Sequence, residues 1–458
     1  MPLFDSADRR PVHFMGIGGA GMSGLALIAC RRGVAVTGCD ADPSGAADLA
    51  ALGVPIATSH SPAHVDGMRA VVYTAAISAE HPELSRARAL GLPVVPRKLA
   101  LAELVAGRTV VAVSGTHGKT TTTVMTTEAL AAAGQDPTGI AGGRVGSWGG
   151  NARIAGDALF VVEADEYDQA FLTLHPTVAV VNNVEPDHLE CYGSLDALED
   201  AFVEFASRAE LVVVGADDEG ARRVAARLGS RAKTFGVAKD ADIRIENLSQ
   251  TPGETAADVV LPGVGVARLR LGVPGLHNLR NAAGALVATL HIAPSKVEQA
   301  LDALRRFRGV GRRFERLGEF KGVEIVDDYA HHPSELAATL AAARQAFPSR
   351  RLVAVFQPHL FSRTAAHGTA MGEALAEADV VVVTEVYAAR EEPIPGVSGR
   401  QVAEAAERAG ADTIFEADRP AVGRRVLALL RPGDVVLTLG AGDITRVGRE
   451  LVQWLQAA

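Results

Sequence analysis

The sequence lacks the features of two large classes of protein. It has 45 Lys and Arg residues against 54 Asp and Glu residues, which gives a formal net charge of −9. A nucleic-acid-binding surface normally needs an excess of basic residues, so we expect no nucleic-acid partner. The apolar runs all fall well short of the about 18 residues that span a membrane, so we expect no membrane partner either.

Cysteine is also scarce. The three cysteines are Cys30, Cys39 and Cys191, an odd number whose spacing matches no zinc or redox motif. We interpret them as buried free thiols in a reducing compartment. The N-terminal segment MPLFDSADRRPVHF has no apolar core of the kind that a secretion signal carries. These observations predict a cytoplasmic protein.

Aromatic residues make up only 5% of the chain, so the hydrophobic cores must be built from Ala, Val and Leu. Short Val-rich runs alternate with helical segments along the chain, among them VHFMGI, TVVAVSG, LFVVEAD, VAVVNNV and LVVVGA. Such runs, bounded by Gly, Asn or Asp, are typical of buried parallel strands. The alternation predicts an α/β protein in which helices pack on mostly parallel sheets.

The length of 458 residues predicts two to four domains, at roughly 100–200 residues per domain. Residues 104–108 separate a predicted helix from a new strand, and the basic, Gly-containing segment 305–318 follows another helix. We therefore predict three domains, at residues 1–107, 108–312 and 313–458. Within the middle domain, residues 247–271 alternate with Pro and Gly turns, which predicts antiparallel strands.

A first Gly-rich turn lies between a predicted strand and a helix. Gly16, Gly18 and Gly21 form the pattern GxGxxG, which lets the backbone approach a pyrophosphate at the helix N-terminus. Asp40 ends the next strand, where a carboxylate can bind a ribose hydroxyl. The pattern does not distinguish NAD from another pyrophosphate-linked nucleotide such as a UDP-sugar. The alternative is a tight turn without a ligand.

A second Gly-rich turn, SGTHGKTT at residues 114–121, also joins a strand to a helix. Its N–H groups can cradle phosphates, Lys119 can neutralise the transferring group, and the Thr120 hydroxyl can hold Mg²⁺. It is a shortened P-loop, because Val113 stands where the full motif has its first Gly. We predict a nucleoside triphosphate site at Gly115, Thr116, His117, Gly118, Lys119, Thr120 and Thr121.

Charged and amide side chains follow the next strands. Glu163 begins the acidic motif EADE at a strand end, where clustered carboxylates need a cation or water to offset their burial. We predict that Glu163 binds a second Mg²⁺, whereas Asp165 and Glu166, each taken alone, are better explained as solvated loop acids. His188, in EPDH after another strand, can bind a metal or a phosphate, or be merely structural.

Asn278 and Asn281 share one face of a predicted helix at i, i+3 spacing. Asn amides suit bidentate contact with adenine, and the alternative is helix capping. In the last third of the chain, three strand ends carry His, Arg or Tyr, in DDYAHHP, FQPHLFSRT and YAAREEPIP. An Arg at such a place can clamp a carboxylate or phosphate, and the shared position of the three segments predicts one converging site.

The chain resembles the Mur ligase family over essentially its whole length. The resemblance lies in six motifs that occur in the family's order, namely GxGxxG, GTHGKTTT, EADE, EPDH, GLHNLRNA and DDYAHHP. HFMGIGGAGMSG, FQPH, YAAREEPIPGVSG and GAGD resemble the L-alanine-adding member in particular. The resemblance implies ATP-dependent joining of L-alanine to UDP-N-acetylmuramate through an acyl phosphate. It also implies an N-terminal Rossmann-like domain that binds the UDP-sugar rather than NAD, a central P-loop ATPase domain with a mostly parallel sheet, and a C-terminal Rossmann-like domain.

The resemblance further implies roles for individual residues. Lys119 would stabilise the transferring phosphoryl group, and Thr120, Glu163 and His188 would hold Mg²⁺. Asn278 and Asn281 would contact the adenine of ATP, and Asp328 its ribose. The UDP-sugar would lie on Gly16, Gly18, Gly19, Gly21, Met22 and Asp40. The amino acid would be surrounded by His332, Arg363, Tyr387 and Arg390. We expect a monomer or weak dimer.

Two departures from the family pattern leave an alternative open. Leu360 stands where the family often has Arg, which removes or replaces one carboxylate clamp. Tyr167 replaces a small Ser after EADE, and EADEYD also occurs in the murein peptide ligase, which joins a tripeptide to the same sugar nucleotide. Pro186, FQPH and REEPIPG favour the L-alanine-adding member.

Two other classes explain less of the sequence. A dehydrogenase would use the first Gly-rich turn but leaves GTHGKT and the acids after it without a role. A non-catalytic nucleotide-binding regulator would not need Glu163, His188 and the three His- and Arg-bearing loops together.

Overall fold

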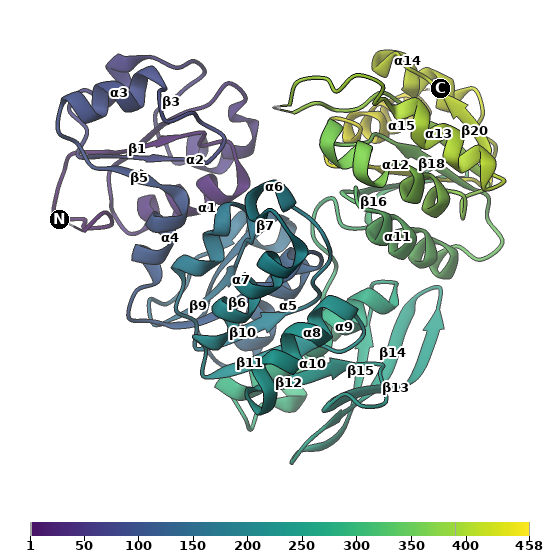
Figure 1. Ribbon diagram of the computed structural model, residues 1–458, viewed down its shortest axis with the longest axis horizontal. Coiled ribbons are helices and arrows are strands. Elements are labelled where there is room, and N and C mark those ends of the chain that lie inside the picture. The colour runs from purple at the N-terminus through teal and green to yellow at the C-terminus, as the bar shows by residue number, and fades with distance from the viewer. Residues whose placement is uncertain (1, 390, 458) are drawn as a thin grey trace. The chain divides into compact units, whose positions relative to one another are not determined.

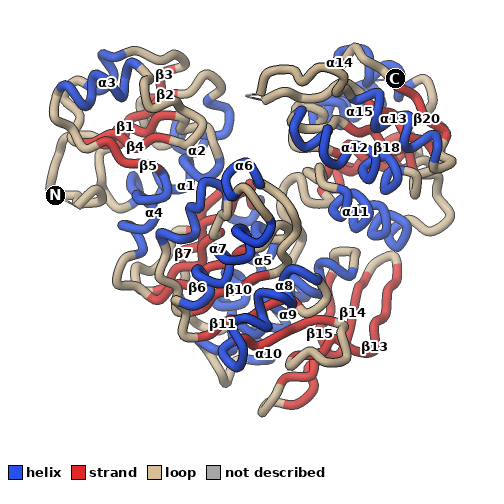
Figure 2. Tube along the Cα trace, viewed as in Figure 1, coloured by secondary structure: helices blue, strands red, loops and turns tan. Residues whose placement is uncertain are grey.

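The structure is a computed structural model, and it describes residues 2–389 and 391–457. In the described part, three β-sheets are flanked by helices, in keeping with the α/β prediction (Figures 1 and 2). No helix among the described residues is both long and apolar enough to cross a membrane.

The first sheet is wholly parallel, with the strand order β3-β2-β1-β4-β5. Its strands are β1 Val12–Met15, β2 Val36–Cys39, β3 Ile56–Ala57, β4 Ala70–Tyr73 and β5 Val94–Pro96. Its helices are α1 Ala20–Arg31, η1 Pro43–Ala46, α2 Ala47–Ala51, η2 Pro62–Val65, α3 Pro82–Ala89 and α4 Arg97–Val105. The strand order reverses at β1, so the turn after β1 opens at the edge where such sheets bind ligands.

The second sheet has ten strands in the order β15-β14-β13-β12-β11-β10-β6-β9-β7-β8. Its strands are β6 Thr109–Ser114, β7 Thr138–Val145, β8 Gly150–Arg153, β9 Leu159–Glu163, β10 Val178–Val181, β11 Leu211–Gly215, β12 Ala232–Gly236, β13 Ile243–Thr251, β14 Glu254–Leu261 and β15 Gly265–Leu271. Its helices are α5 Lys119–Ala132, η3 Gly146–Trp148, η4 Tyr167–Thr173, α6 Leu189–Tyr192, α7 Leu195–Ser207, α8 Glu219–Leu228, η5 Gly229–Arg231, α9 Leu276–Ile292 and α10 Val297–Arg306. Strands β9, β6 and β10 are parallel neighbours, which brings EADE, the P-loop and EPDH to one sheet edge.

The third sheet has the order β16-β17-β21-β18-β19-β20, with only β16 antiparallel to its neighbour. Its strands are β16 Glu315–Phe320, β17 Val323–Asp328, β18 Leu352–Phe356, β19 Val380–Val383, β20 Asp412–Phe415 and β21 Val435–Leu439. Its helices are α11 Pro333–Ala346, α12 Phe361–Leu375, α13 Gly399–Arg408, α14 Arg419–Leu427 and α15 Thr445–Ala457. The core residues alternate along β18, where Ala354 packs with the α11–α13 side and Val355 with the α14–α15 side.

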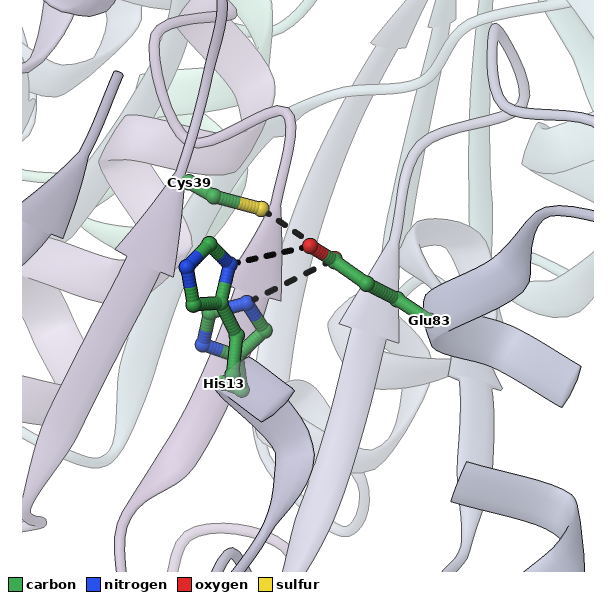
Figure 3. A group of neighbouring side chains, drawn as sticks. His13, Cys39 and Glu83 are labelled. Atoms are coloured by element: carbon green, nitrogen blue, oxygen red, sulfur yellow. Dashed lines mark hydrogen bonds and ion pairs between the residues drawn. The ribbon is translucent and has the colours of Figure 1, made fainter. Parts of the chain in front are cut away.

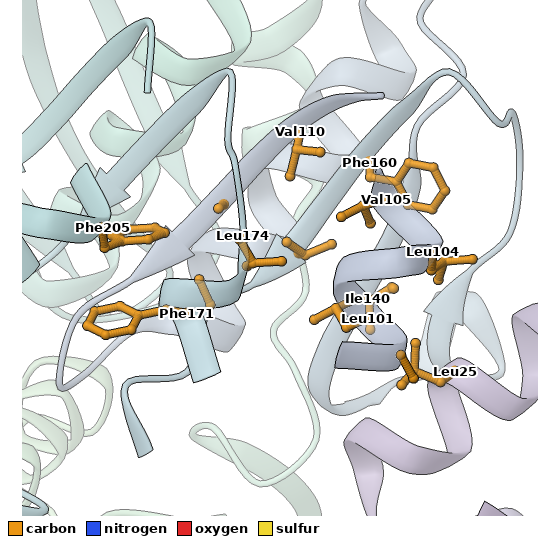
Figure 4. Packing of buried hydrophobic residues seen from close by; sticks show 14 of the residues in the cluster. Leu25, Leu101, Leu104, Val105, Val110, Ile140, Phe160, Phe171, Leu174 and Phe205 are labelled. Carbon is orange, nitrogen blue, oxygen red and sulfur yellow. The ribbon is translucent and has the colours of Figure 1, made fainter. Parts of the chain in front are cut away.

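The cores are built as the composition predicts, mainly from Val, Leu and Ala. One cluster contains Leu25 of α1, Leu101 of α4, and Ile140 and Phe160 of the second sheet (Figure 4). Burial of each such side chain contributes about 1.5–3 kcal/mol. The three cysteines are free thiols as expected, but only Cys39 is buried, so the expected burial of Cys30 and Cys191 is wrong. Both end up half-buried because they lie at helix positions near the surface of their layers.

Two compact units are distinguished in the chain. The first contains the residues up to Leu248, Ala257–Arg270 and Arg280–Phe307, and the second contains Ser249–Ala256, Leu271–Leu279 and the residues from Arg308 onward. The first two sheets thus share a unit, while the third belongs to the other. The domain boundaries that we place at residues 107 and 312 stay predictions.

Candidate active site

The second Gly-rich turn has the backbone of a phosphate-binding loop. It leaves β6 at Ser114 and opens α5 at Lys119, so the first N–H groups of a long helix point out of the turn. Gly118 has a φ of 79°, and a Cβ there would lie 2.4 Å from Asn281 Oδ1. Glycine is therefore required at this position on two grounds, its left-handed backbone and the closeness of Asn281.

Lys119 is held inside this turn by a buried carboxylate. Its Nζ donates to Glu166 Oε1 and Oε2 at 2.9 and 2.8 Å and to the carbonyl oxygen of Gly115 at 2.8 Å. Desolvation disfavours the charged form, but attraction by Glu166 and Asp165 outweighs it and raises the pKa of Lys119. The turn thus contains a fixed positive charge at the place where we predict that phosphates bind.

Glu166 is a functional candidate that the sequence interpretation missed. We expected it to be a solvated loop acid, yet only 2% of its side chain is exposed. The residue alone carries no signal for this, because its partner Lys119 is 47 positions away. The parallel pairing of β6 with β9 brings the two segments together.

Thr120 and Glu163 meet beside Lys119. The Thr120 hydroxyl donates to Glu163 Oε1 at 3.2 Å, and the amide of Gly142 donates to Glu163 Oε2 at 2.6 Å. A Cβ at Gly142 would lie 2.7 Å from both carboxylate oxygens, so a larger residue there would displace the Glu163 carboxylate. A hydroxyl and a carboxylate side by side are oxygen donors of the kind that Mg²⁺ prefers, so these residues fit the predicted metal.

His188 lies at the N-terminus of α6 with a left-handed φ of 54°. Its Nδ1 is 3.4 Å from Glu190 Oε1, its Nε2 is 3.7 Å from Asp187 Oδ2, and its ring packs edge-on against Tyr167 at 5.0 Å. Its predicted share in a metal site with Glu163 stays a prediction.

The two helical amides differ in their surroundings. Asn281 lies against Gly118 of the phosphate loop, and 7% of it is exposed. Asn278 Nδ2 donates to the carbonyl oxygen of Pro274 at 2.7 Å, four residues earlier and just before α9. Contact of either amide with adenine stays a prediction.

Asp328 ends β17 as a buried acid. Its Oδ2 accepts from the amide of Phe314 at 2.6 Å and its Oδ1 from the amide of Ala330 at 2.7 Å. Burial raises the pKa of Asp328 to about 6, although Arg313 and these amides favour the charged form. The carboxyl therefore changes charge near physiological pH.

The first Gly-rich turn is braced by Asp40. Its Oδ2 accepts from the amide of Gly18 at 2.8 Å and its Oδ1 from the amide of Asp42 at 2.9 Å. A Cβ at Gly18 would lie 2.4 Å from the carbonyl oxygen of Asp42 and 2.9 Å from Asp40 Oδ2. The structure thus joins Asp40 to the turn, and its predicted contact with a ribose hydroxyl stays a prediction.

Other residues of this turn differ in exposure. Gly19, the N-cap of α1, is exposed and has an ordinary φ of −66°. The Met22 side chain is 2% exposed and belongs to the hydrophobic core. A Cβ at Gly21 would lie 2.8 Å from Arg97 Nη1. Arg97 is thus a cation beside the predicted pyrophosphate-binding turn, and the sequence interpretation missed it because the residue follows a different strand, β5.

The predicted amino-acid residues gather around the ends of β17 and β18. Arg363 is 7% exposed and its Nη1 is 3.5 Å from His359 Nδ1, while the Tyr387 ring stacks on His359 at 5.7 Å. His332 begins α11, with its ring 5.0 Å from that of His367. His359, which the sequence showed only as part of FQPH, is the shared contact. Arg390 lies outside the described residues.

Leu360, the departure from the family pattern, begins α12 with a positive φ of 69° and is buried. The guanidinium groups of Arg312 and Arg313 both lie over the ring of Tyr329, 4.9 Å from its centroid. Arg312 Nε is also 3.3 Å from Asp327 Oδ2, and Arg313 Nη1 is 3.6 Å from Glu335 Oε1. Arg363 is the guanidinium that contacts His359.

The three parts of the chain match three family models. Residues 11–109 match the Mur ligase family catalytic domain, residues 113–289 the Mur ligase middle domain, and residues 312–442 the Mur ligase glutamate ligase domain. A UDP-N-acetylmuramate–L-alanine ligase of Kineococcus radiotolerans is 47% identical over 455 residues, which covers 97% of this chain and 96% of that protein.

Solved structures agree with this match. The UDP-N-acetylmuramate-alanine ligase of Thermotoga maritima has a TM-score of 0.85 and 32% identity, covering 98% of this chain and 99% of that one. A murein peptide ligase of Psychrobacter arcticus has a TM-score of 0.73 with 24% identity over 98% of this chain and 99% of its own, a likeness of fold alone. The chain belongs to the Mur ligase family.

Proposed function

We propose that the protein is an ATP-dependent amide ligase that joins L-alanine to UDP-N-acetylmuramate, the first amino-acid addition in peptidoglycan synthesis. The observation that carries the proposal is the phosphate loop, where Lys119 and Glu166 form a buried ion pair and Thr120 contacts Glu163. The near-full-length likeness to enzymes with this name supports the choice of substrates.

The reaction proceeds in two steps. The lactyl carboxylate of UDP-N-acetylmuramate attacks the γ-phosphate of ATP, which releases ADP and gives an acyl phosphate. The free amine of L-alanine then attacks the acyl carbon, and phosphate leaves. Both steps develop negative charge on oxygens, so cations fixed beforehand are the main requirement.

Residues of the phosphate loop meet this requirement. The ammonium of Lys119 stabilises charge on the transferring phosphoryl group, and the N–H groups at the start of α5 bind the other phosphates. Thr120, Glu163 and His188 would hold Mg²⁺, which supplies charge neutralisation when it is bound. Asn281, which lies against Gly118, would contact the base of ATP together with Asn278, and Asp328 would contact its ribose.

The other two substrates bind at other strand ends. The turn Gly16–Gly21, with Asp40 behind it and Arg97 beside it, binds the pyrophosphate of the UDP-sugar. His332, Arg363 and Tyr387, together with Arg390, bind L-alanine, with the Arg363 guanidinium on its carboxylate. We further propose that the enzyme acts in the cytoplasm, where these substrates are found, as a monomer or weak dimer.

The experiment that tests this function is phosphate release from ATP and Mg²⁺ by the purified protein. UDP-N-acetylmuramate is supplied with L-alanine, glycine, L-serine or the tripeptide L-Ala-γ-D-Glu-diaminopimelate, one at a time. Release that requires both the sugar nucleotide and L-alanine supports the proposal. Preference for the tripeptide would assign the murein peptide ligase reaction instead, and no release with any acceptor would refute ligase activity.

A further inference from the structure

Four side chains with metal-binding atoms meet in the region of the first sheet (Figure 3). They are His13 of β1, Cys39 at the end of β2, His64 of η2 and Glu83 of α3. One donor atom from each lies within 4.8 Å of every other. We refer to these four residues as the His–Cys–Glu cluster.

Glu83 is the centre of this cluster. The residue is fully buried, at 0% exposure. Its Oε2 accepts from Cys39 Sγ at 3.3 Å, and its Oε1 lies 2.9 Å from His64 Nδ1 and accepts from the amide of Ser61 at 2.6 Å. Two separate segments, the end of β2 and η2 with its N-cap Ser61, therefore direct polar atoms at one buried carboxylate.

His13 supplies the second observation. It is 2% exposed, and its Nε2 is a buried atom without a hydrogen-bond partner, 3.8 Å from Glu83 Oε2. Its Nδ1 lies 2.9 Å from Thr37 Oγ1, whose own hydrogen is donated to Met68 Sδ. The Thr37 oxygen can then only accept, so the His13 ring carries a hydrogen on Nδ1, and in the neutral imidazole Nε2 has a lone pair directed at Glu83.

With neutral His13, this arrangement is unfavourable unless a proton or a metal ion lies between Nε2 and the carboxylate. The buried lone pair on His13 Nε2 then faces a buried carboxylate. Both groups are hydrogen-bond acceptors, so neither offsets the cost of removing the other from water. A metal ion between them would accept an electron pair from the imidazole nitrogen and one from the carboxylate. The outer hydrogen bond from Nδ1 to Thr37 is the kind of contact that orients a metal-binding histidine.

We propose that the His–Cys–Glu cluster binds one zinc ion through His13 Nε2, Cys39 Sγ, His64 Nδ1 and a Glu83 carboxylate oxygen. Bonds of roughly 2.0–2.3 Å to tetrahedral zinc place neighbouring donors about 3.3–3.8 Å apart. Glu83 Oε2 lies 3.3 Å from Cys39 Sγ and 3.8 Å from His13 Nε2, within that range, and Oε1 lies 2.9 Å from His64 Nδ1, somewhat below it. Thiolate and imidazole donors favour zinc over Mg²⁺.

The ion would be structural and the charges would balance. Four protein donors leave no open position for a substrate. Binding displaces the hydrogen of Cys39 from its bond to Glu83 and releases one proton to solvent, so thiolate and carboxylate together neutralise Zn²⁺. His60, whose Nδ1 lies 3.3 Å from Cys39 Sγ and which is one-third exposed, is a neighbouring imidazole at the solvent side.

The position of the cluster connects it to the nucleotide-binding edge of the sheet. Cys39 directly precedes Asp40, and His13 is on the strand that leads into Gly16. A bound ion would tie β1, β2, η2 and α3 together behind that turn. The proposal does not depend on the ligase activity, because its ligands are separate from those of the phosphate loop.

The test uses the full-length protein, freed of metal by a chelator and titrated with Co²⁺ as a spectroscopic substitute for Zn²⁺. We expect one Co²⁺ per chain, with the absorption of a tetrahedral ion and a thiolate-to-cobalt charge-transfer band. Cys39→Ser should abolish that band and weaken binding by more than about tenfold. Cys30→Ser is the matched control, because Cys30 is a free thiol of the same sheet region outside the cluster, and it should behave as the wild type.

A second variant distinguishes loss of metal binding from misfolding. His64 is a quarter exposed, so His64→Gln should keep the far-ultraviolet circular dichroism of the wild type while losing Co²⁺ affinity. Zn²⁺ should raise the melting temperature of the wild type and of Cys30→Ser but not of His64→Gln. Absence of Co²⁺ binding by the wild type, or an unchanged cobalt spectrum in Cys39→Ser and His64→Gln, would overturn the proposal.

Discussion

The two Gly-rich turns of this protein have similar backbones and different chemistry. Each follows a buried parallel strand and opens a helix, at Gly16–Gly21 and at Gly115–Lys119. In the first turn, the side chain that contacts the backbone is an acid, Asp40, bonded to the amide of Gly18. In the second, Lys119 lies inside the turn and is fixed by Glu166.

This difference separates binding from transfer. Helix N–H groups suffice to bind phosphates in either turn. Moving a phosphoryl group also requires stabilisation of charge that develops during the reaction, and a preorganised cation provides this. We infer that the first turn, which has Arg97 beside it but no lysine within it, holds a nucleotide, whereas the second, with Lys119 inside it, also promotes phosphoryl transfer.

The largest effect is expected for Lys119→Ala. Loss of the ammonium should lower kcat for phosphate release by about 10²–10³-fold, while the Kd for UDP-N-acetylmuramate measured by calorimetry stays unchanged. The substitution also leaves Glu166 buried without its cation, so the double variant Lys119→Ala/Glu166→Gln separates lost catalysis from lost stability. An equal loss of sugar-nucleotide binding in both variants would contradict the division between the turns.

A smaller effect is expected for Gly18→Ala in the first turn. The added Cβ would displace Asp40 and the carbonyl oxygen of Asp42, so the KM for UDP-N-acetylmuramate should rise by roughly tenfold or more with little change in kcat. Gly253→Ala is the control, since a Cβ at Gly253 meets open space. A fall in kcat at saturating sugar nucleotide would show that the first turn acts in the chemical step.

Acidic pH should affect ATP use through Asp328. Because its pKa is about 6, the carboxyl becomes neutral below that pH and no longer accepts two hydrogen bonds from a ribose. The kcat/KM for ATP should fall as the pH drops through about 6, and Asp328→Asn should lack this transition and be low throughout. An identical pH profile in Asp328→Asn would remove the proposed role.

The free energy of unfolding should depend on pH in the opposite direction to the kcat/KM for ATP. Between the ordinary value of 3.8 and about 6, the folded protein binds more protons at Asp328 than the unfolded chain does. The free energy of unfolding should therefore decrease as the pH rises through that window, by on the order of 2–3 kcal/mol. Urea unfolding of the wild type and Asp328→Asn at pH 4.5 and pH 7, roughly the two sides of the window, measures this difference. A difference of the opposite sign would contradict the burial argument.

The smallest effect concerns the contact between the two regions that carry the turns. Arg144 makes a bidentate pair with Asp48 at 2.9 and 2.7 Å, but its side chain is 52% exposed. Solvent screening limits such a pair, so Arg144→Ala should lower the free energy of unfolding by less than about 1 kcal/mol. A loss of several kcal/mol in chemical denaturation would show that this pair carries the contact between the two regions.

The local parts of both turns could be predicted from the sequence. A Val-rich run, a Gly-rich turn and a helix are signals within a few consecutive residues, and the backbone at Gly118 and the start of α5 at Lys119 follow from them. The acids at the ends of β2 and β9 were also located correctly, because parallel strands place their carboxyl ends at one edge.

Partners that lie far apart in the chain could not be predicted. Glu166 was interpreted as a solvated acid, although its pairing with Lys119 makes it a buried one. Arg97 was not selected at all, although it lies beside Gly21. Neither contact can be predicted from the spacing of residues along the chain, since each depends on which strands become neighbours.

The sequence by itself determined the α/β class, the two Gly-rich turns and the family, because these depend on local periodicity and on short motifs. Only the tertiary structure decided what surrounds the turns. Residues 13, 39, 64 and 83 match no metal motif, yet the parallel register pairs His13 with Thr37 and puts Cys39 on the same face two residues later. Sheet register and helix packing, rather than spacing along the chain, bring such donor atoms together.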